Sequence, residues 1–178
     1  MKPVANMIRW ALVALAIAAP AMATASVPAA PRTLDRAVRH ELLMLPYYNV
    51  FDNLEFQVSG DTVTLLGQVT SAVLKSDAAA AVKRIAGVKA VTNDIEVLPI
   101  SPMDNRIRLA ELRAIYRNSE LNRYAAGPLP SIHIIVKNGH VTLAGVVATE
   151  MDRNVAGIKA NGVPFVFSVT NDLIVSKS

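Results

Sequence analysis

The chain has 178 residues, no cysteine, a formal net charge of +4 and a mean hydropathy of +0.35. The missing cysteine excludes disulfides, thiolate metal sites, thiol nucleophiles and attachment of a lipid to cysteine. The charge is uneven: residues 27–100 hold seven Lys and Arg against eight Asp and Glu, whereas residues 101–178 hold nine against six. The second half, with its excess of basic residues, is therefore the better partner for an anionic surface.

The first 25 residues have the pattern of a secretory signal peptide. Lys2 and Arg9 precede an apolar run over 10–19, which is too short to span a bilayer comfortably. Two A-x-A cleavage sites follow, over 21–23 and 23–25. We therefore expect residues 1–25 to be removed on export and the mature protein to be soluble in the periplasm. The alternative, a retained membrane anchor, is disfavoured by Pro20 and its small neighbours.

After a short Pro-rich tether over 26–33, the first half of the chain shows helical and then strand periodicity. Thr33 is the expected N-cap of the first helix, Pro46 stops that helix, and Gly87 is the expected left-handed C-cap of the second. In chain order we expect a helix over 34–45, a loop with aromatic anchors over 47–53, a hairpin of strands over 54–58 and 63–69, a helix over 74–85 and a last strand over 88–97.

The second half repeats this order after a linker over 99–103, which contains two prolines. Its first helix is expected over 104–124 and its second over 150–161, and strands are expected over 132–136, 141–147 and 166–175. Asn138-Gly139 is a strong hairpin signal, and the loop over 126–130 is rigid because of its prolines. The side chains expected on the buried face of the first helix are Leu109, Leu112, Ile115 and Tyr116.

Two blocks recur in both halves at one offset. The tripeptide Val-Thr-Leu begins at Val63 and again at Val141, and the quartet Val-Thr-Asn-Asp begins at Val91 and again at Val169. The offset is 78 residues in both cases, which indicates two copies of one unit. We place the units at 34–98 and 104–176. Because a Pro-rich linker divides them, we expect a fragment of residues 103–178 to keep its secondary structure.

The repeated pattern Gly-x-Val-Thr-Leu-x-Gly-x-Val, followed by a helix and Val-x-Asn-x-Leu/Ile-x-Val, resembles the BON domain family. The pattern occurs over 61–69 together with 87–97, and again over 138–147 together with 165–175. In the first copy Asp61 takes the place of the opening glycine and is preceded by Gly60. The resemblance implies an α+β fold of two tandem α-β-β-α-β units, each a mixed three-stranded sheet packed by two helices. It also implies a periplasmic protein that binds membranes or envelope components without catalysis.

The second unit departs from this pattern at Phe165, where the first unit has Gly87. Because a positive φ is costly for Phe, we expect a loop of different shape there. Phe165 either fills the core, which is the interpretation we favour, or contacts a membrane or partner. A further departure is the missing lipid-attachment cysteine, which makes this chain similar to the soluble members of the family.

The remaining polar and glycine positions favour structural roles. Gly67 and Gly145 lie inside strands, where glycine indicates a bulge or a close backbone approach. Asn93 and Asn171, each followed by Asp, are expected to form local backbone hydrogen bonds. We expect His133 and His140 on the exposed face of the second hairpin, with no third ligand spaced for Zn²⁺. The chain shows no metal, cofactor or catalytic pattern, and we predict no enzyme, nucleic-acid partner or small-molecule substrate.

One charged pattern points to function. Arg106, Arg113 and Arg117 fall within about 40° of one another on the first helix of the second unit, opposite its apolar face. Such a helix suits an anionic lipid surface, although any solvated helix can show the same pattern. The candidate lipid-binding residues are Arg106, Arg113, Arg117, Tyr124, Leu129 and Phe165.

We interpret the sequence as a non-catalytic periplasmic protein whose second unit associates with anionic phospholipid surfaces. The alternative is a protein-interaction or chaperone-like module in envelope or osmotic stress, in which an exposed sheet edge captures an extended client strand.

The first prediction concerns processing. The A-x-A sites and the missing cysteine predict cleavage after Ala23 or Ala25, without any added acyl chain. The intact mass of the exported protein measures both features. A mature N-terminus upstream of Pro20, or a mass increment equal to a lipid, contradicts the prediction.

Overall fold

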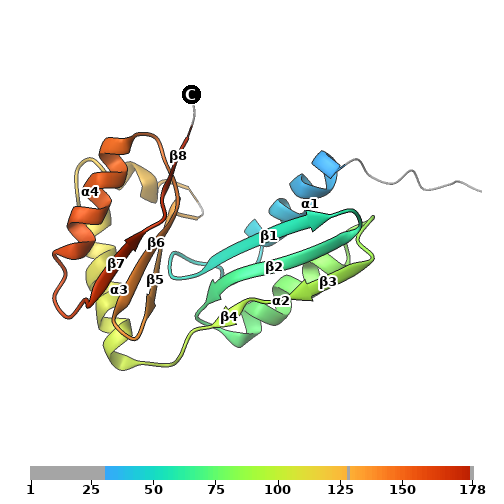
Figure 1. The fold of residues 1–178 in the computed structure, drawn as a ribbon, viewed down its shortest axis with the longest axis horizontal. Coiled ribbons are helices and arrows are strands. Elements are labelled where there is room, and N and C mark those ends of the chain that lie inside the picture. Colours follow the sequence, from blue (N-terminus) through green and yellow to red (C-terminus); the bar gives the residue numbers. More distant parts are fainter. Residues whose placement is uncertain (1–30, 128, 177–178) are drawn as a thin grey trace, which may run out of the picture.

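The computed structural model describes residues 31–127 and 129–176 and shows two units of similar construction (Figure 1). Each unit runs helix, strand, strand, helix and third strand, so the predicted α+β fold of two tandem units is confirmed. The predicted signal peptide and residues 26–30 of the tether lie outside the described residues. In each unit the third strand is split into two short strands, where the sequence predicted one.

The first unit carries two helices on a mixed sheet. Its elements are α1 (Pro31–Leu43), β1 (Asn53–Ser59), β2 (Thr62–Val69), α2 (Ala72–Lys83), β3 (Ala90–Asn93) and β4 (Glu96–Val97). Strand β1 is antiparallel to β2, and β3 and β4 run parallel to β2 on its other side. Apolar side chains of both helices meet those of β2 in one core, which includes Val38, Leu65, Leu74 and Val82.

The second unit repeats this topology with one addition, a short 3-10 helix. Its elements are α3 (Pro102–Tyr116), η1 (Asn122–Ala125), β5 (Ile132–Lys137), β6 (His140–Val147), α4 (Glu150–Asn161), β7 (Ser168–Asn171) and β8 (Ile174–Val175). Strand β5 pairs antiparallel with β6, and β7 and β8 pair parallel with β6. Asn138 and Gly139 form the predicted two-residue turn, with φ of 53° and 80°.

Helices α1, α2 and α3 all begin two or three residues earlier than the sequence predicted. Helix α1 starts at Pro31, so Thr33 lies inside it and is not its N-cap. Helix α3 starts at Pro102, inside the predicted linker over 99–103. The Ser101 hydroxyl caps the helix by accepting the Asp104 N–H at 3.1 Å. A proline is tolerated at the first helical position because the backbone N–H that it lacks would have no partner within the helix. The second proline of the linker therefore begins a helix instead of preventing one.

The same three helices also end earlier than predicted, α1 at Leu43 and not at residue 45. Helix α3 stops at Tyr116 and not at Tyr124, because the Asn118 side chain accepts the N–H groups of Glu120 and Leu121 and turns the chain. Helix α2 stops at Lys83 with Arg84 as its C-cap. Gly87, the predicted C-cap, instead has its φ of 97° in the loop that leads to β3.

The buried face of α3 differs from the predicted one. Leu109, predicted to be buried, is 46% exposed. The side chains that face the core are Asp104, Ile107, Arg108, Glu111 and Ile115, and Leu112 and Tyr116 are partly buried. The helix therefore buries three charged residues, which apolar periodicity cannot anticipate.

The predicted structural roles of the strand glycines and the two asparagines are confirmed. A Cβ on Gly67 would lie 2.1 Å from the Asn53 carbonyl oxygen, and one on Gly145 equally close to that of Ser131, so only glycine fits either strand. The Asn93 and Asn171 side chains accept the N–H groups of Ile95 and Leu173, both at 3.4 Å, which are the local bonds expected. The same side chains also donate to the carbonyl oxygens of Lys75 and Arg153. Each amide ties the third strand of its unit to the second helix.

A loop of the first unit, residues 47–53, joins the two units, and we call it the joint segment. Val50 is 8% exposed and belongs to the core of the second unit, against which Phe51 also packs. The Val50 carbonyl oxygen accepts the N–H of Ile134, in β5, at 2.8 Å. The ring of Tyr48 stacks on His133 at a centroid distance of 5.6 Å. The aromatic loop expected from the sequence is therefore the contact between the units.

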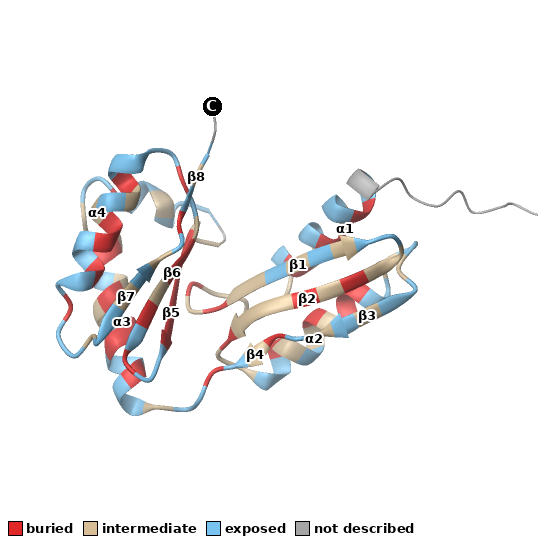
Figure 2. Ribbon diagram, in the orientation of Figure 1, coloured by how far each residue is buried: buried red, intermediate tan, exposed pale blue. Residues whose placement is uncertain are grey.

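The joint segment is held in shape by the first unit. Asp52 is fully buried, and its carboxylate accepts the backbone N–H of Thr70 at 2.6 Å and the Thr70 hydroxyl at 2.8 Å. The other carboxylate oxygen accepts the Asn49 N–H at 3.2 Å. These bonds fix the segment against the end of β2. On the sheet face of the second unit that carries no helix, His133 is buried against Tyr48 of this segment, and β5 is mostly buried along its length (Figure 2).

The joint segment changes what we expect of an isolated second unit. A fragment of residues 99–178, which keeps the Ser101 cap, lacks Val50 and its bond to Ile134. Amide hydrogen exchange measured by NMR should therefore be slow at Ile134 in the mature chain and fast in the fragment. The Val141 amide, in the middle of the sheet, is the matched control and should stay protected in both. Equal protection of Ile134 in the two samples means that the joint does not form in solution.

Candidate functional site

Three arginines of the second unit share one outer surface, which we call the arginine face. Arg106, Arg113 and Arg117 are all exposed, and they lie on α3 and at its C-cap. At about 100° per residue they lie opposite Ile107, Glu111 and Ile115, which are buried. Within the described ranges, none of the three guanidinium groups has an ion pair or a hydrogen bond. Their charges are therefore available to an external anion.

Apolar side chains flank the arginine face. Leu109 is 46% exposed, and Met103, in the first turn of α3, is 44% exposed. At helical spacing Leu109 lies between the arginines and the partly buried Leu112. The outer surface of α3 therefore mixes positive charge with apolar area, which the sequence pattern had assigned to opposite faces.

Phe165 does not fill the core, contrary to the interpretation that we favoured from the sequence. It adopts a φ of 70°, so the loop keeps the left-handed conformation that Gly87 has in the first unit. Its side chain is 70% exposed and does not fill the core. A left-handed Phe costs on the order of 1 kcal/mol, and the surrounding loop imposes this conformation. Of the two interpretations left open by the sequence, exposure is therefore the one observed.

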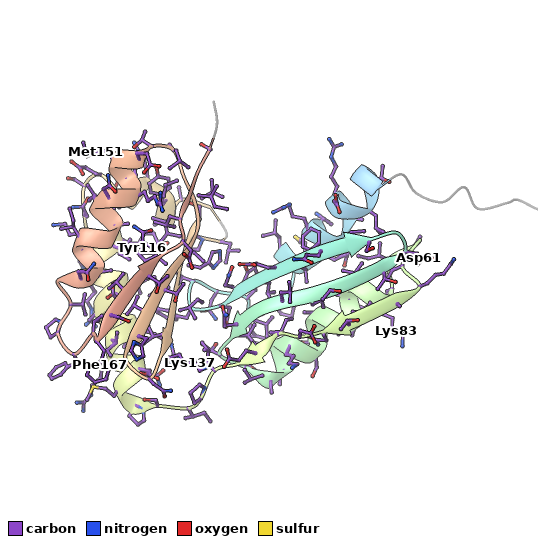
Figure 3. All side chains as sticks on the ribbon, viewed as in Figure 1. Asp61, Lys83, Tyr116, Lys137, Met151 and Phe167 are labelled. Atoms are coloured by element: carbon purple, nitrogen blue, oxygen red, sulfur yellow. The ribbon has the colours of Figure 1, made fainter. Side chains whose placement is uncertain are left out.

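Phe167 is a second exposed aromatic residue that the sequence analysis missed. It is 77% exposed, and its ring covers Gly139, where a Cβ would lie 2.6 Å from it (Figure 3). The same turn is bound to α3, because the Asp104 carboxylate accepts the N–H groups of Asn138 and Gly139 at 3.0 and 2.8 Å. Phe167 therefore lies at the end of the unit where α3 and the arginine face begin. Its position two residues after Phe165 was the only available signal.

Tyr124 and Leu129, the other two candidates, lie apart from the arginine face. The Tyr124 hydroxyl donates to Asp152 at 2.8 Å and accepts the Ala148 N–H at 2.8 Å. Arg123 also binds that carboxylate. Burial alone would raise the Asp152 pKa, but hydrogen bonds from Thr149, Tyr124 and Arg123 lower it. Leu129 is partly buried and lines a cleft between the units. Tyr124 therefore fixes the loop before β5, and Leu129 belongs to a different surface.

The BON domain family model matches residues 32–99 and 118–177, which together make up most of the chain. This chain belongs to the BON domain family. BON domains act in general as membrane- or protein-interaction modules, and the family is generally non-catalytic. The described residues contain no helix long and apolar enough to cross a bilayer.

Two solved structures resemble the tandem BON units. Both are of CdsD, a structural protein of the type III secretion system of Chlamydia trachomatis. The first is 12% identical, covers 82% of this chain and 93% of its own, and has a TM-score of 0.34. The second, a C-terminal domain, is 13% identical, covers 81% and 98%, and has a TM-score of 0.29. Likeness at this level supports no inference about function, and no curated protein matches the chain.

The histidines of the second BON unit do not form a metal site. His133 is 7% exposed, so its predicted exposure is wrong, and burial lowers its pKa. His140 is exposed, as predicted, and its Nδ1 lies 2.7 Å from the Ser168 hydroxyl. Among the described residues, no three His, Asp or Glu side chains are grouped to hold a metal ion.

The buried side of α3 holds an unusual pair of charged residues. Arg108 donates to the carbonyl oxygen of Val136 at 2.7 Å and to the Asn105 side chain at 2.6 Å, but its Nε has no partner. Glu111 is fully buried, and neither of its carboxylate oxygens accepts a hydrogen bond. Burial raises the pKa of Glu111 to about 8. At neutral pH the second BON unit therefore carries a largely protonated carboxylic acid in its core.

Glu111 predicts an unusual pH dependence of stability. Its pKa rises from 4.5 to about 8 on folding, so its contribution is complete below pH 4.5 and is lost as the pH rises towards 8. The loss is on the order of 5 kcal/mol, because the shift from 4.5 to about 8 spans roughly 3.5 pKa units and each unit corresponds to about 1.4 kcal/mol. Urea unfolding of Glu111→Gln should show a gain in stability over the wild type that grows across this range.

The exposed Glu120 of the same unit supplies the matched control. Replacing Glu120 with Gln should leave the pH dependence of unfolding unchanged. A wild type and a Glu111→Gln variant that follow parallel stability curves from pH 4.5 to 8 would refute the burial of an ionisable Glu111.

Proposed function

We propose that the protein is an exported, non-catalytic envelope-binding protein of the periplasm, and that its second BON unit binds anionic phospholipid surfaces. The observation that carries this proposal is the arginine face: Arg106, Arg113 and Arg117 are exposed, share one side of α3 and have no partner in the described chain. Family membership supports the general class of function, a membrane- or protein-interaction module.

The proposed binding is electrostatic with an apolar contribution. Each Lys or Arg near an anionic membrane surface contributes about 1 kcal/mol, so three arginines raise the binding constant by about two orders of magnitude. Leu109 and Met103 flank these charges, and the exposed Phe167 lies near the start of the helix. Partial insertion of such side chains adds about 0.8 kcal/mol per buried methylene group. The surface therefore fits a weak, salt-sensitive association with the headgroup region.

A second candidate function is protein interaction, including a chaperone-like role in envelope or osmotic stress. The observation that favours it is a cleft between the two BON units beside an unpaired strand edge. Because this surface shares no residue with the arginine face, the two functions can be separated by mutation.

The arginine face gives the test of lipid binding. Replacing Arg106, Arg113 and Arg117 together with Gln should leave folding nearly intact, since each solvent-facing change costs within about 0.5 kcal/mol. Affinity for phosphatidylglycerol vesicles should fall by about two orders of magnitude, together with most of its salt dependence. Co-sedimentation over a range of salt concentrations measures both.

The matched control removes the same charge from the first BON unit. Arg36, Lys83 and Arg84 are exposed and have no ion pair in the described chain, and their triple Gln variant should keep nearly all binding. Equal losses in both variants would show a dependence on net charge alone. Full binding by the arginine-face variant would place the lipid surface elsewhere, and a wild type that binds no anionic vesicle would exclude the lipid proposal.

A further inference from the structure

The two BON units treat the outer edge of their first strand differently. In the second unit, each outward-facing residue of β5 has a partner for one of its two backbone groups. The Ile132 carbonyl oxygen accepts the Tyr116 hydroxyl, the Ile134 N–H donates to Val50, and the Val136 carbonyl oxygen accepts from Arg108. Helix α3 and the joint segment therefore close this edge to further pairing.

The equivalent edge, that of β1, remains open. Ser59 pairs with Thr62 across a two-residue turn, so alternate residues from Asn53 to Ser59 exchange hydrogen bonds with β2. The backbone groups of Leu54, Phe56 and Val58 therefore point away from the sheet. The Leu54 N–H donates to the Tyr48 hydroxyl at 3.3 Å. No residue of the described chain hydrogen bonds to the outward groups of Phe56 and Val58, and β1 is the last strand on its side of the sheet (Figure 1).

A cleft of about 600 Å³ lies beside this edge, between the two BON units. One wall is the β1 backbone over 53–56 and the end of α1, including Leu43, which is 52% exposed. The opposite wall is the helix-free sheet face of the second unit, where Val146 is 46% and Ile174 is 65% exposed. Leu129 and Pro130, from the rigid loop, also line the cleft. Exposed apolar side chains therefore stand on both sides of an unpaired strand.

We propose that this cleft binds an extended segment of a partner polypeptide, which adds to β1 as a further strand. The bonds would run between the outward backbone groups of Phe56 and Val58 and the backbone of the segment. Alternate side chains of the segment would face Leu43 and Phe56 on one side and Val146 and Ile174 on the other. The partner is thus a short extended stretch with apolar residues, recognised mainly through its backbone.

Two observations support this occupant over a compact ligand. The cleft is continuous with the joint between the units, since His133 and Tyr48 belong both to its lining and to the joint. At that joint the chain already uses the proposed contact, because the Val50 carbonyl oxygen binds the outward N–H of a first strand.

The test begins with peptides selected from a random decapeptide library on the immobilised mature protein. Selected peptides, made synthetically, should shift and protect the amides of Phe56 and Val58 in NMR spectra of the full chain. Methylating the backbone nitrogens of alternate peptide residues should abolish binding in one parity and preserve it in the other, because only alternate N–H groups of an added strand face β1. Amide shifts confined to other surfaces, or equal effects of both parities, would overturn the proposal.

Variants of the cleft complete the experiment. Ile174→Glu places a charge on the apolar wall and should weaken peptide binding at least about tenfold. Ile158→Glu, at a 70% exposed position on α4 outside the cleft lining, is the matched control and should change affinity by less than about twofold. The arginine-face triple variant should bind peptide like the wild type, so a failure of lipid binding leaves this result intact. Failure to enrich any peptide, or unchanged binding by Ile174→Glu, would contradict the proposal.

Discussion

The bond between Val50 and Ile134, with the packing around it, is the contact on which the arrangement of this molecule depends. A unit of this length has a small core and a sheet with two open edges, and the first unit supplies what the second lacks. Val50 enters the second core, and its carbonyl oxygen closes one position of the β5 edge. Tyr48 covers His133 on the helix-free sheet face. The exposed ion pair between Lys137 and Glu96 adds little by comparison.

This joint separates the two proposed surfaces. Because the helix-free face of the second sheet is turned towards the first unit, its helices face away from the joint, and Arg106, Arg113 and Arg117 remain free for an external surface. The same docking places Val146 and Ile174 opposite β1 and so creates the cleft. One surface can therefore face a membrane while the other faces a polypeptide. This division follows from packing between the units and is invisible in either unit alone.

The sequence predicted the repeated topology well, because it rests on local signals. The Asn138-Gly139 turn follows from backbone chemistry within the hairpin. The strand glycines and the two asparagines are recognised by residue type and position, although their contacts are with a neighbouring strand or helix. The shifted ends of α3 follow from local caps at Ser101 and Asn118, whereas the failures at single side chains have a tertiary origin. Leu109 is exposed because charged residues occupy the core side of α3, and His133 is buried because the other unit covers it. Phe165 accepts a positive φ that its residue type disfavours, since the repeated loop requires that conformation.

The buried side of α3 also affects its exposed side. With the pKa of Glu111 near 8, this carboxyl group is largely neutral at pH 7, so the only full negative charge on the helix is that of Asp104. The Asp104 carboxylate accepts the N–H groups of Asn138 and Gly139 on the core side of the helix. Glu111 therefore does not offset the field of Arg106, Arg113 and Arg117 as an ionised carboxylate would. Burial of an acid that destabilises the fold thus strengthens the positive potential of the surface proposed to meet anionic lipid.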